Sequence, residues 1–256
     1  MTDLVMSLQA APKWLFLAWD DVLRQYRRTL LGPVWVTLTT LVLIVSLSVL
    51  WSTIFRIDLA DYLPYFAIGQ ILFFYYSGVI NESCTAYLHA ESYIKQLALP
   101  RSFFIFRTVT RNLLLFAHNL PVLIGSVLVF RSVDWPGVLV SLLALGAVTA
   151  GLWGVGLFLA SLSARFRDVP FVVANIMQAI FFLSPILWKV DALPSDVRDL
   201  LLLNPVAVWI MTVRDPLLGV SLPGSVWVAL GAWTVVFLAL GLVTLAFTRR
   251  RVPYWL

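Results

Sequence analysis

The chain has 256 residues, of which 61% are hydrophobic and 12% are charged, and its mean hydropathy is +0.92. Because a soluble domain carries about 25% charged residues, this composition excludes an ordinary water-soluble enzyme and indicates a protein whose solvent is lipid. The net charge of +5 comes from cations that gather beside apolar runs, so it does not require nucleic-acid binding. A lone cysteine, Cys84, excludes an intramolecular disulfide and a paired-cysteine metal site.

Residues 1–33 predict an N-terminal segment that lies on the membrane surface. Within residues 4–24, the aromatic Trp14, Phe16 and Trp19 alternate with charged side chains, which is typical of an amphipathic interfacial helix. A soluble N-terminal helix is the alternative. The acidic Asp3 and the late start of the first apolar run argue against a secretory signal.

Three arginines, Arg24, Arg27 and Arg28, stand just before the first long apolar run. The guanidinium fork matches phosphate oxygens, and Arg24 and Arg28 share one face if the helix continues between them. Two interpretations stay open. The arginines recognise a lipid pyrophosphate headgroup, or they anchor the chain to anionic lipid at about 1 kcal/mol per residue.

Six segments are long and apolar enough to cross the membrane as helices of about 20 residues. The predicted spans are residues 34–55, 62–80, 103–130, 137–163, 171–188 and 225–248. The fourth span carries Gly146, Ala150 and Gly154 at four-residue spacing, which favours close packing against another helix of the same subunit.

The segment 189–223 is too apolar for a solvated loop, but each apolar piece in it is too short to cross. Pro205 has no N–H and disfavours helix at Asn204, so Asn204 and Pro205 should form a break between two short re-entrant or interfacial helices. A competing interpretation makes residues 200–213 a seventh span.

The distribution of positive charge favours six spans. With the N-terminus inside, the inner side holds 13 of the 18 lysines and arginines, in agreement with the excess found in cytoplasmic loops. A seventh span would place Arg249, Arg250 and Arg251 outside. The predicted fold is therefore an all-α integral membrane protein with six transmembrane helices per subunit, short re-entrant helices between spans five and six, and both termini cytoplasmic. Residues 34–248 form the membrane domain and residues 249–256 a basic cytoplasmic tail.

The motifs of common enzymes and nucleotide-binding proteins are missing from the sequence. There is no GxxxxGK[ST] phosphate loop, no GxSxG and no HExxH. The predicted spans also lack the chain of carboxylates that ion-coupled transporters commonly bury. We expect neither a metal nor a bound cofactor on this chain, so the energy for any transport would come from a separate chain.

An ordered set of motifs resembles a known family. The motifs are YRRTLLGPVW (26–35), IKQLALPR (94–101), RFRDV (165–169), FFLSPILW (181–188), LNP (203–205) and RVPYWL (251–256). Together they resemble the membrane subunit of ABC exporters that move lipid-linked polysaccharides, within the type-2 ABC transmembrane family. The ending is most similar to O-antigen exporters, with capsule and teichoic-acid exporters related. Gln96 stands where many relatives have a second lysine.

This resemblance implies half of a transporter in the bacterial cytoplasmic (inner) membrane. Two copies of the chain would form a homodimer, and two copies of a separate ATPase would hydrolyse ATP with Mg²⁺, so the chain itself is no enzyme. The substrate would be a polysaccharide on undecaprenyl pyrophosphate. Alternatives are a type-2 ABC exporter of a different lipid or drug, a polyprenyl-phosphate membrane enzyme, and a self-contained channel or secondary transporter.

The resemblance also implies residues that couple the ATPase to the channel. They are Lys95, Gln96, Pro100 and Arg101 in one predicted cytoplasmic loop and Arg165, Arg167 and Asp168 in another. The alternatives are a plain connector for the first loop and a topology signal for the second. Arg107 and Arg111, four residues apart, are expected to be snorkelling anchors at the end of span three.

Aromatic side chains could line a glycan pathway, since sugars stack their C–H faces on aromatic rings. The candidates are Trp35, Phe73, Phe74, Tyr75 and Tyr76. The alternative is that they belong to an interfacial aromatic belt or fill lipid-facing surface.

Overall fold

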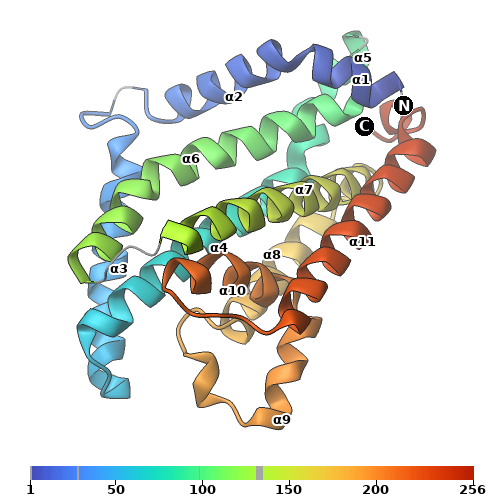
Figure 1. Cartoon of the computed structure of the whole chain (residues 1–256). Coiled ribbons are helices and arrows are strands. Elements are labelled where there is room, and N and C mark those ends of the chain that lie inside the picture. The colour runs from blue at the N-terminus through green and yellow to red at the C-terminus, as the bar shows by residue number, and fades with distance from the viewer. Residues whose placement is uncertain (1, 28, 98, 131–134) are drawn as a thin grey trace.

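The computed structural model describes residues 2–27, 29–97, 99–130 and 135–256, and all regular structure in them is helical (Figure 1). This agrees with the predicted all-α fold. The helices are α1 (Thr2–Gln9), α2 (Ala11–Gln25), α3 (Val34–Phe55), α4 (Leu59–His89), α5 (Glu91–Gln96), α6 (Arg101–Phe130), α7 (Trp135–Arg165), α8 (Val169–Leu183), η1 (Val190–Ala192), α9 (Ser195–Arg198), η2 (Asp199–Leu203), α10 (Pro205–Leu217), α11 (Gly224–Thr248) and α12 (Val252–Trp255).

Helix α4 is the centre of the bundle. In its most apolar stretch 83% of the residues are buried, whereas in α3 and α11 only 17% are. Helix α4 packs against α6, α7, α3, α8 and α10. The contrast leaves α3 and α11 as peripheral helices whose apolar side chains face outward, as lipid contact requires.

Helices α7 and α11 approach each other closely at two glycines. A Cβ atom at Gly154 would collide with the backbone carbonyl of Phe237, and one at Gly241 would collide with the backbone of Gly154. The predicted close packing of small residues within one subunit is therefore present at Gly154. At Gly146, by contrast, a Cβ would meet nothing within 4 Å.

Among the described residues, five helices are long and apolar enough to cross a membrane, namely α3, α4, α6, α7 and α11. The predicted fifth span, 171–188, is wrong in its extent, because α8 has only 15 residues and ends at Leu183. Ser184 is extended (φ −102°, ψ 148°) because it precedes Pro185, which disfavours helix at that position. Helix α10, with 13 residues, is too short to serve as the alternative seventh span.

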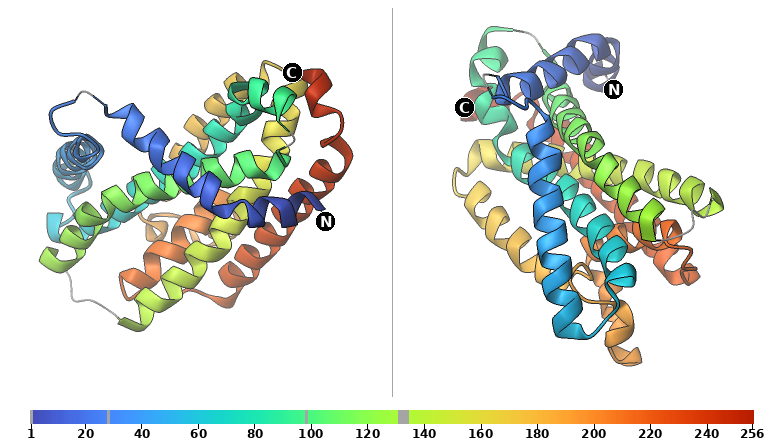
Figure 2. Two further views of the ribbon diagram at one scale, coloured as in Figure 1. Left: turned by 90° about the horizontal axis from the view of Figure 1, so that it is seen from above. Right: turned by 90° about the vertical axis from the view of Figure 1, so that its left-hand side faces the viewer.

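The N-terminal segment forms two helices rather than one, with the break at Ala10, where the chain turns just before Pro12. Seen from above, α1 and α2 lie flat across one end of the bundle, whereas α3 is viewed along its axis (Figure 2, left). Both ends of the chain and α5 lie at one end of the bundle, and α9 lies at the other (Figure 1). We refer to these as the α5 end and the α9 end.

Candidate functional site

The α5 end carries the residues predicted to couple the channel to an ATPase. Helix α5 exposes Lys95 and Gln96, and the Lys95 Nζ lies 2.6 Å from Glu91 Oε1, one turn earlier. The hydrogen bond from Lys95 lowers the pKa of the Glu91 carboxyl. Pro100 is buried, and α6 begins at the next residue.

The start of α6 is capped by Asp3, which lies in α1 near the N-terminus. The backbone N–H of Arg101 donates to Asp3 Oδ2 (N···O 2.9 Å) and that of Ser102 to Asp3 Oδ1 (3.1 Å). The Ser102 hydroxyl also donates to Asp3 Oδ1, at 2.5 Å. A carboxylate here satisfies N–H groups that a helix start leaves free and complements the helix dipole. Arg101 is thus held through its backbone N–H, and its Nη1 also donates to the Leu99 carbonyl at 3.0 Å.

Helix α2 is tied to α6 by an ion pair and a hydrogen bond. The Arg107 guanidinium donates twice to the Asp21 carboxylate, at 2.7 and 2.6 Å. Arg111 pairs with Glu82 of α4 and donates to Gln25 of α2 at 2.6 Å. Both guanidinium groups bind side chains of this subunit, a role that the expectation of snorkelling anchors did not include.

Two of the arginines predicted to recognise pyrophosphate, Arg24 and Arg27, lie where α2 ends. Arg24 forms an ion pair with Asp20 at 2.6 Å, and both Arg24 and Arg27 are exposed. Arg28 lies outside the described residues. Nearby, burial raises the pKa of the Tyr26 hydroxyl, an effect partly opposed by the charge of Arg111. Arg24 and Arg27 thus both lie on the surface of the protein near the end of α2.

The turn between α7 and α8 exposes the second predicted coupling group, Arg165, Arg167 and Asp168. It is in contact with the end of the chain. The Arg165 guanidinium lies 5.5 Å from the ring centroid of Trp255, and Arg167 Nη2 donates to the backbone oxygen of Trp255 at 3.4 Å. The two predicted coupling groups therefore lie at the same end of the bundle.

The predicted pathway aromatics divide into buried and exposed residues. Trp35 is 40% exposed and Phe74 38% exposed. Phe73, Tyr75 and Tyr76 are buried in the core, where the Tyr75 hydroxyl lies 3.1 Å from Thr149 Oγ1 and Tyr76 donates to the Trp209 carbonyl at 3.3 Å. Only Trp35 and Phe74 of this group present a large part of their surface to the outside of the subunit.

At the α9 end, Asn204 joins two chain segments where helix is broken. Its Oδ1 accepts the backbone N–H groups of Val206 and Ala207 at the start of α10, at 3.1 and 3.2 Å. Its Nδ2 donates to Ser184 Oγ at 3.0 Å. Pro205 occupies the first helical position, where a missing N–H costs nothing. Asn204 therefore fixes the start of α10 beside the end of α8.

The backbone carbonyls that follow α8 are held by side chains of α4 and α10. The Tyr62 hydroxyl donates to the Leu187 carbonyl at 2.7 Å, and that of Tyr65 to the Trp188 carbonyl at 2.8 Å. Arg214 donates to the Pro185 carbonyl. A broken helix leaves carbonyls without partners in the helix, and here side chains of the same subunit supply those partners.

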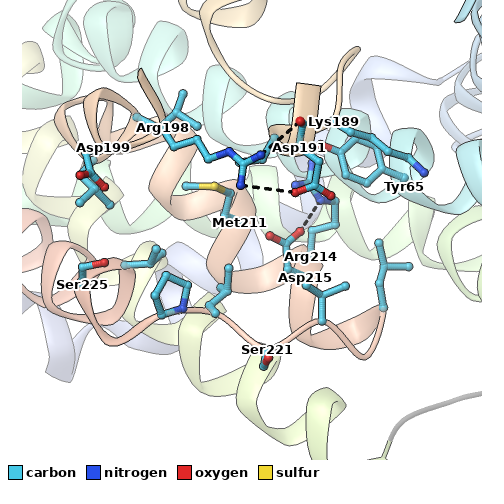
Figure 3. Close-up of a pocket in the computed structure, with 18 of the residues that line it drawn as sticks. Tyr65, Lys189, Asp191, Arg198, Asp199, Met211, Arg214, Asp215, Ser221 and Ser225 are labelled. Atoms are coloured by element: carbon cyan, nitrogen blue, oxygen red, sulfur yellow. Dashed lines mark hydrogen bonds and ion pairs between the residues drawn. The ribbon is translucent and has the colours of Figure 1, made fainter. Parts of the chain in front are cut away.

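Arg214 and Asp215 form a buried ion pair beside a cavity of about 430 Å³ at the α9 end (Figure 3). Arg214 is 0% exposed, and its Nε lies 2.7 Å from Asp215 Oδ1. Its guanidinium carbon also lies 3.8 Å from the Tyr65 ring centroid. In Figure 3, Asp199 and Ser225 lie at one end of the cavity, away from Tyr65 and Asp215. Charged groups that line the cavity are Asp61, Lys189, Asp191, Arg198, Asp199, Arg214 and Asp215.

This architecture agrees with the comparison of the sequence with known families. Residues 12–218 match the ABC-2 type transporter family. The chain belongs to that family. The match covers the helices from α2 to α10, including both predicted coupling groups and the break at Asn204, so the chain is the membrane subunit, or permease, of an ABC transporter.

The permease is similar to proteins from two bacteria. It is 23% identical over 198 residues to an O-antigen export system permease protein RfbA of Klebsiella pneumoniae, covering 76% of each chain. It is 24% identical over 186 residues to a protein of the same name from Myxococcus xanthus, covering 71% of this chain and 70% of the relative. Together with the apolar helices, these matches place the permease in the bacterial inner membrane as a multi-pass protein.

Two features of the permease were not found from its sequence. No role was predicted for Arg214 from the sequence, although a charged Arg-Asp pair inside an apolar run is a signal for a buried or functional group. The pairing of Arg107 with Asp21 joins residues 86 positions apart. Nothing in the local sequence pattern indicates that pair.

Proposed function

We propose that this permease is half of an ATP-driven exporter that moves a polysaccharide linked to undecaprenyl pyrophosphate across the cytoplasmic membrane. The observation that carries the proposal is the family match over residues 12–218, together with relatives named O-antigen export permeases. The pyrophosphate lipid is the part that rests on the motif resemblance alone. ATP and Mg²⁺ would bind to a separate ATPase chain, present in two copies on a permease homodimer.

The proposed topology has the α5 end in the cytoplasm. Helix α8 enters from that end, residues 184–198 extend to the α9 end, and η2 leads back to Asn204 beside the end of α8. Helix α10 stays inside the protein, and α11 returns to the α5 end, which gives six crossings with both described ends inside. The buried polar contacts of Tyr62, Tyr65 and Arg214 support this arrangement because they satisfy the irregular backbone.

The proposed roles of the surface residues follow from where they lie. Helix α5 and the α7–α8 turn would contact the ATPase through Lys95, Gln96, Arg165, Arg167 and Asp168, with Pro100 and Arg101 passing motion to α6. Arg24, Arg27 and Arg28 would receive the pyrophosphate at the inner leaflet. Trp35 and Phe74 would face the glycan, and Phe73, Tyr75 and Tyr76 would fix α4 behind them.

A gene deletion with complementation tests this function. Loss of the permease should remove a surface glycan and leave lipid-linked glycan accumulated on the inner side of the membrane. Both effects should be reversed by the wild-type chain together with its ATPase. If deletion leaves the surface glycan unchanged but abolishes export of a different lipid or a drug, that compound and not a polysaccharide is the substrate.

A further inference from the structure

We propose that the segment Arg251–Leu256, through Trp255, holds α5 against the α7–α8 turn, so that the two elements present one fixed surface to the ATPase. The proposal rests on the proposed function only in naming an ATPase as the partner at the α5 end. Trp255 is a positioning residue in this account, because it acts through α5 and the turn.

Helix α5 has little support of its own. It contains six residues, and Ile94 is its one buried residue. Isolated helices shorter than about 12 residues are marginal in water, so α5 must be held by its neighbours. Its main packing partners are α4, from which it is separated by Ala90, and α12. The orientation of α5 therefore depends on where α12 is held.

Helix α12 is in turn fastened to the α7–α8 turn. Val252 is completely buried, and α12 packs against α7 as well as α5. The Arg165 guanidinium lies 5.5 Å from the ring centroids of both Phe166 and Trp255, a favourable arrangement of a cation between aromatic rings. Arg167 Nη2 lies 3.4 Å from the backbone oxygens of Trp255 and of Leu256.

These contacts make α12 a bridge between two elements that are about 70 residues apart in the sequence. Without the bridge, the attraction between the Glu91 carboxylate of α5 and Arg167 of the turn would remain, but the packing through α12 would be lost. With it, a force applied to α5 is also applied to the start of α8. The sequence predicted residues 249–256 only as a basic tail, without a bridging role.

The two consecutive aromatics of α12 supply a matched pair of variants. Trp255 is partly buried against Arg165, whereas Tyr254 is 88% exposed. If α12 acts by bridging, Trp255 matters and Tyr254 does not. If α12 instead touches the ATPase directly, the exposed Tyr254 is the residue that matters.

Hydrogen–deuterium exchange on the full-length permease tests the bridge. In Trp255→Ala we expect the amides of residues 91–97 to exchange on the order of tenfold faster, while the amides of α7 keep their wild-type protection. Trp255→Phe, which keeps a ring beside Arg165, and Tyr254→Ala should both exchange like wild type. Should Trp255→Ala fail to insert, Arg165→Met removes the same contact from the other side.

The same variants are then assembled with the ATPase. We expect Trp255→Ala to lower the amount of glycan exported per ATP hydrolysed, with Trp255→Phe restoring it and Tyr254→Ala leaving it unchanged. Wild-type exchange of α5 in Trp255→Ala and in Arg165→Met would overturn the proposal, as would wild-type export per ATP despite faster exchange. If no ATPase binds the wild-type permease, the proposed function fails, but the exchange experiment still decides whether α12 positions α5.

Discussion

The Arg214 guanidinium carbon lies 3.8 Å from the Tyr65 ring centroid, and the Pro185 backbone oxygen, which accepts from Arg214, lies 3.1 Å from the Tyr65 hydroxyl that donates to Trp188. The contact joins α10, α4 and the end of α8 at one point. Because Arg214 is completely buried, its charge is tolerable only with Asp215 and these oxygen and ring partners in place. This cluster fixes α10 inside the protein.

Arg214→Met should destabilise the permease by about 3–5 kcal/mol, because it leaves the Asp215 carboxylate buried without its cation. Arg214→Met combined with Asp215→Leu should recover much of that loss, since no buried charge remains. The measurement is the free energy of unfolding in mixed micelles, with the exposed Arg198→Met as the control. A double variant as unstable as Arg214→Met alone would show that the unpaired carboxylate is not the cause.

Gly154→Val should prevent α7 and α11 from packing, because the new side chain meets the backbone of Phe237 rather than a movable side chain. Ordinary overpacking costs about 1–3 kcal/mol, and this position should reach or exceed the upper value. Gly146→Val is the matched control on the same helix, where a Cβ meets nothing within 4 Å. Equal amounts of folded protein for the two variants would contradict the close approach seen here.

Local hydropathy predicts the peripheral helices well and the broken region poorly. The predicted span 34–55 coincides with α3 (Val34–Phe55), because a lipid-facing helix is defined by its own apolar length. The predicted span 171–188 overruns α8, because the residues after Pro185 are apolar but bend into the protein. Their apolarity reflects burial in the bundle and not a continued helix.

The sequence predicts which segments carry the candidate site residues, but not which residues contact each other. Sequence motifs indicate which segments carry Lys95, Arg101 or Arg167, since those signals are local. They do not indicate that Asp3 caps α6 or that Trp255 meets Arg165, because such contacts join residues 98 and 90 positions apart. Only the packing of the helices brings those residues together.

Exchanging the charges of Asp21 and Arg107 tests how α2 is attached. Each single reversal, Asp21→Arg or Arg107→Asp, should free α2 from α6 by placing like charges in a partly buried contact. The double reversal should restore the attachment. Protection of the α2 amides from hydrogen exchange reports the result. If the double reversal leaves α2 as mobile as the single ones, the ion pair does not hold this helix.

Replacing Arg24, Arg27 and Arg28 together by lysine separates recognition from anchoring. Lysine keeps the positive charge that orients the membrane segment but loses the bidentate fork that suits a pyrophosphate. We expect surface glycan to fall while membrane levels and ATPase binding stay at wild-type values. Wild-type glycan output would leave these arginines as anchors. Glutamate variants do not separate the two roles, because they impair both.

The central claim is that this permease and a separate ATPase together move a lipid-linked polysaccharide. The most direct measurement is transfer of a polysaccharide linked to undecaprenyl pyrophosphate across the membrane of proteoliposomes that contain both chains. Transfer should require ATP, Mg²⁺ and both chains, and should be absent with the permease or the ATPase alone. Transfer by the permease without the ATPase, or none with both chains, ATP and Mg²⁺ present, would contradict the account.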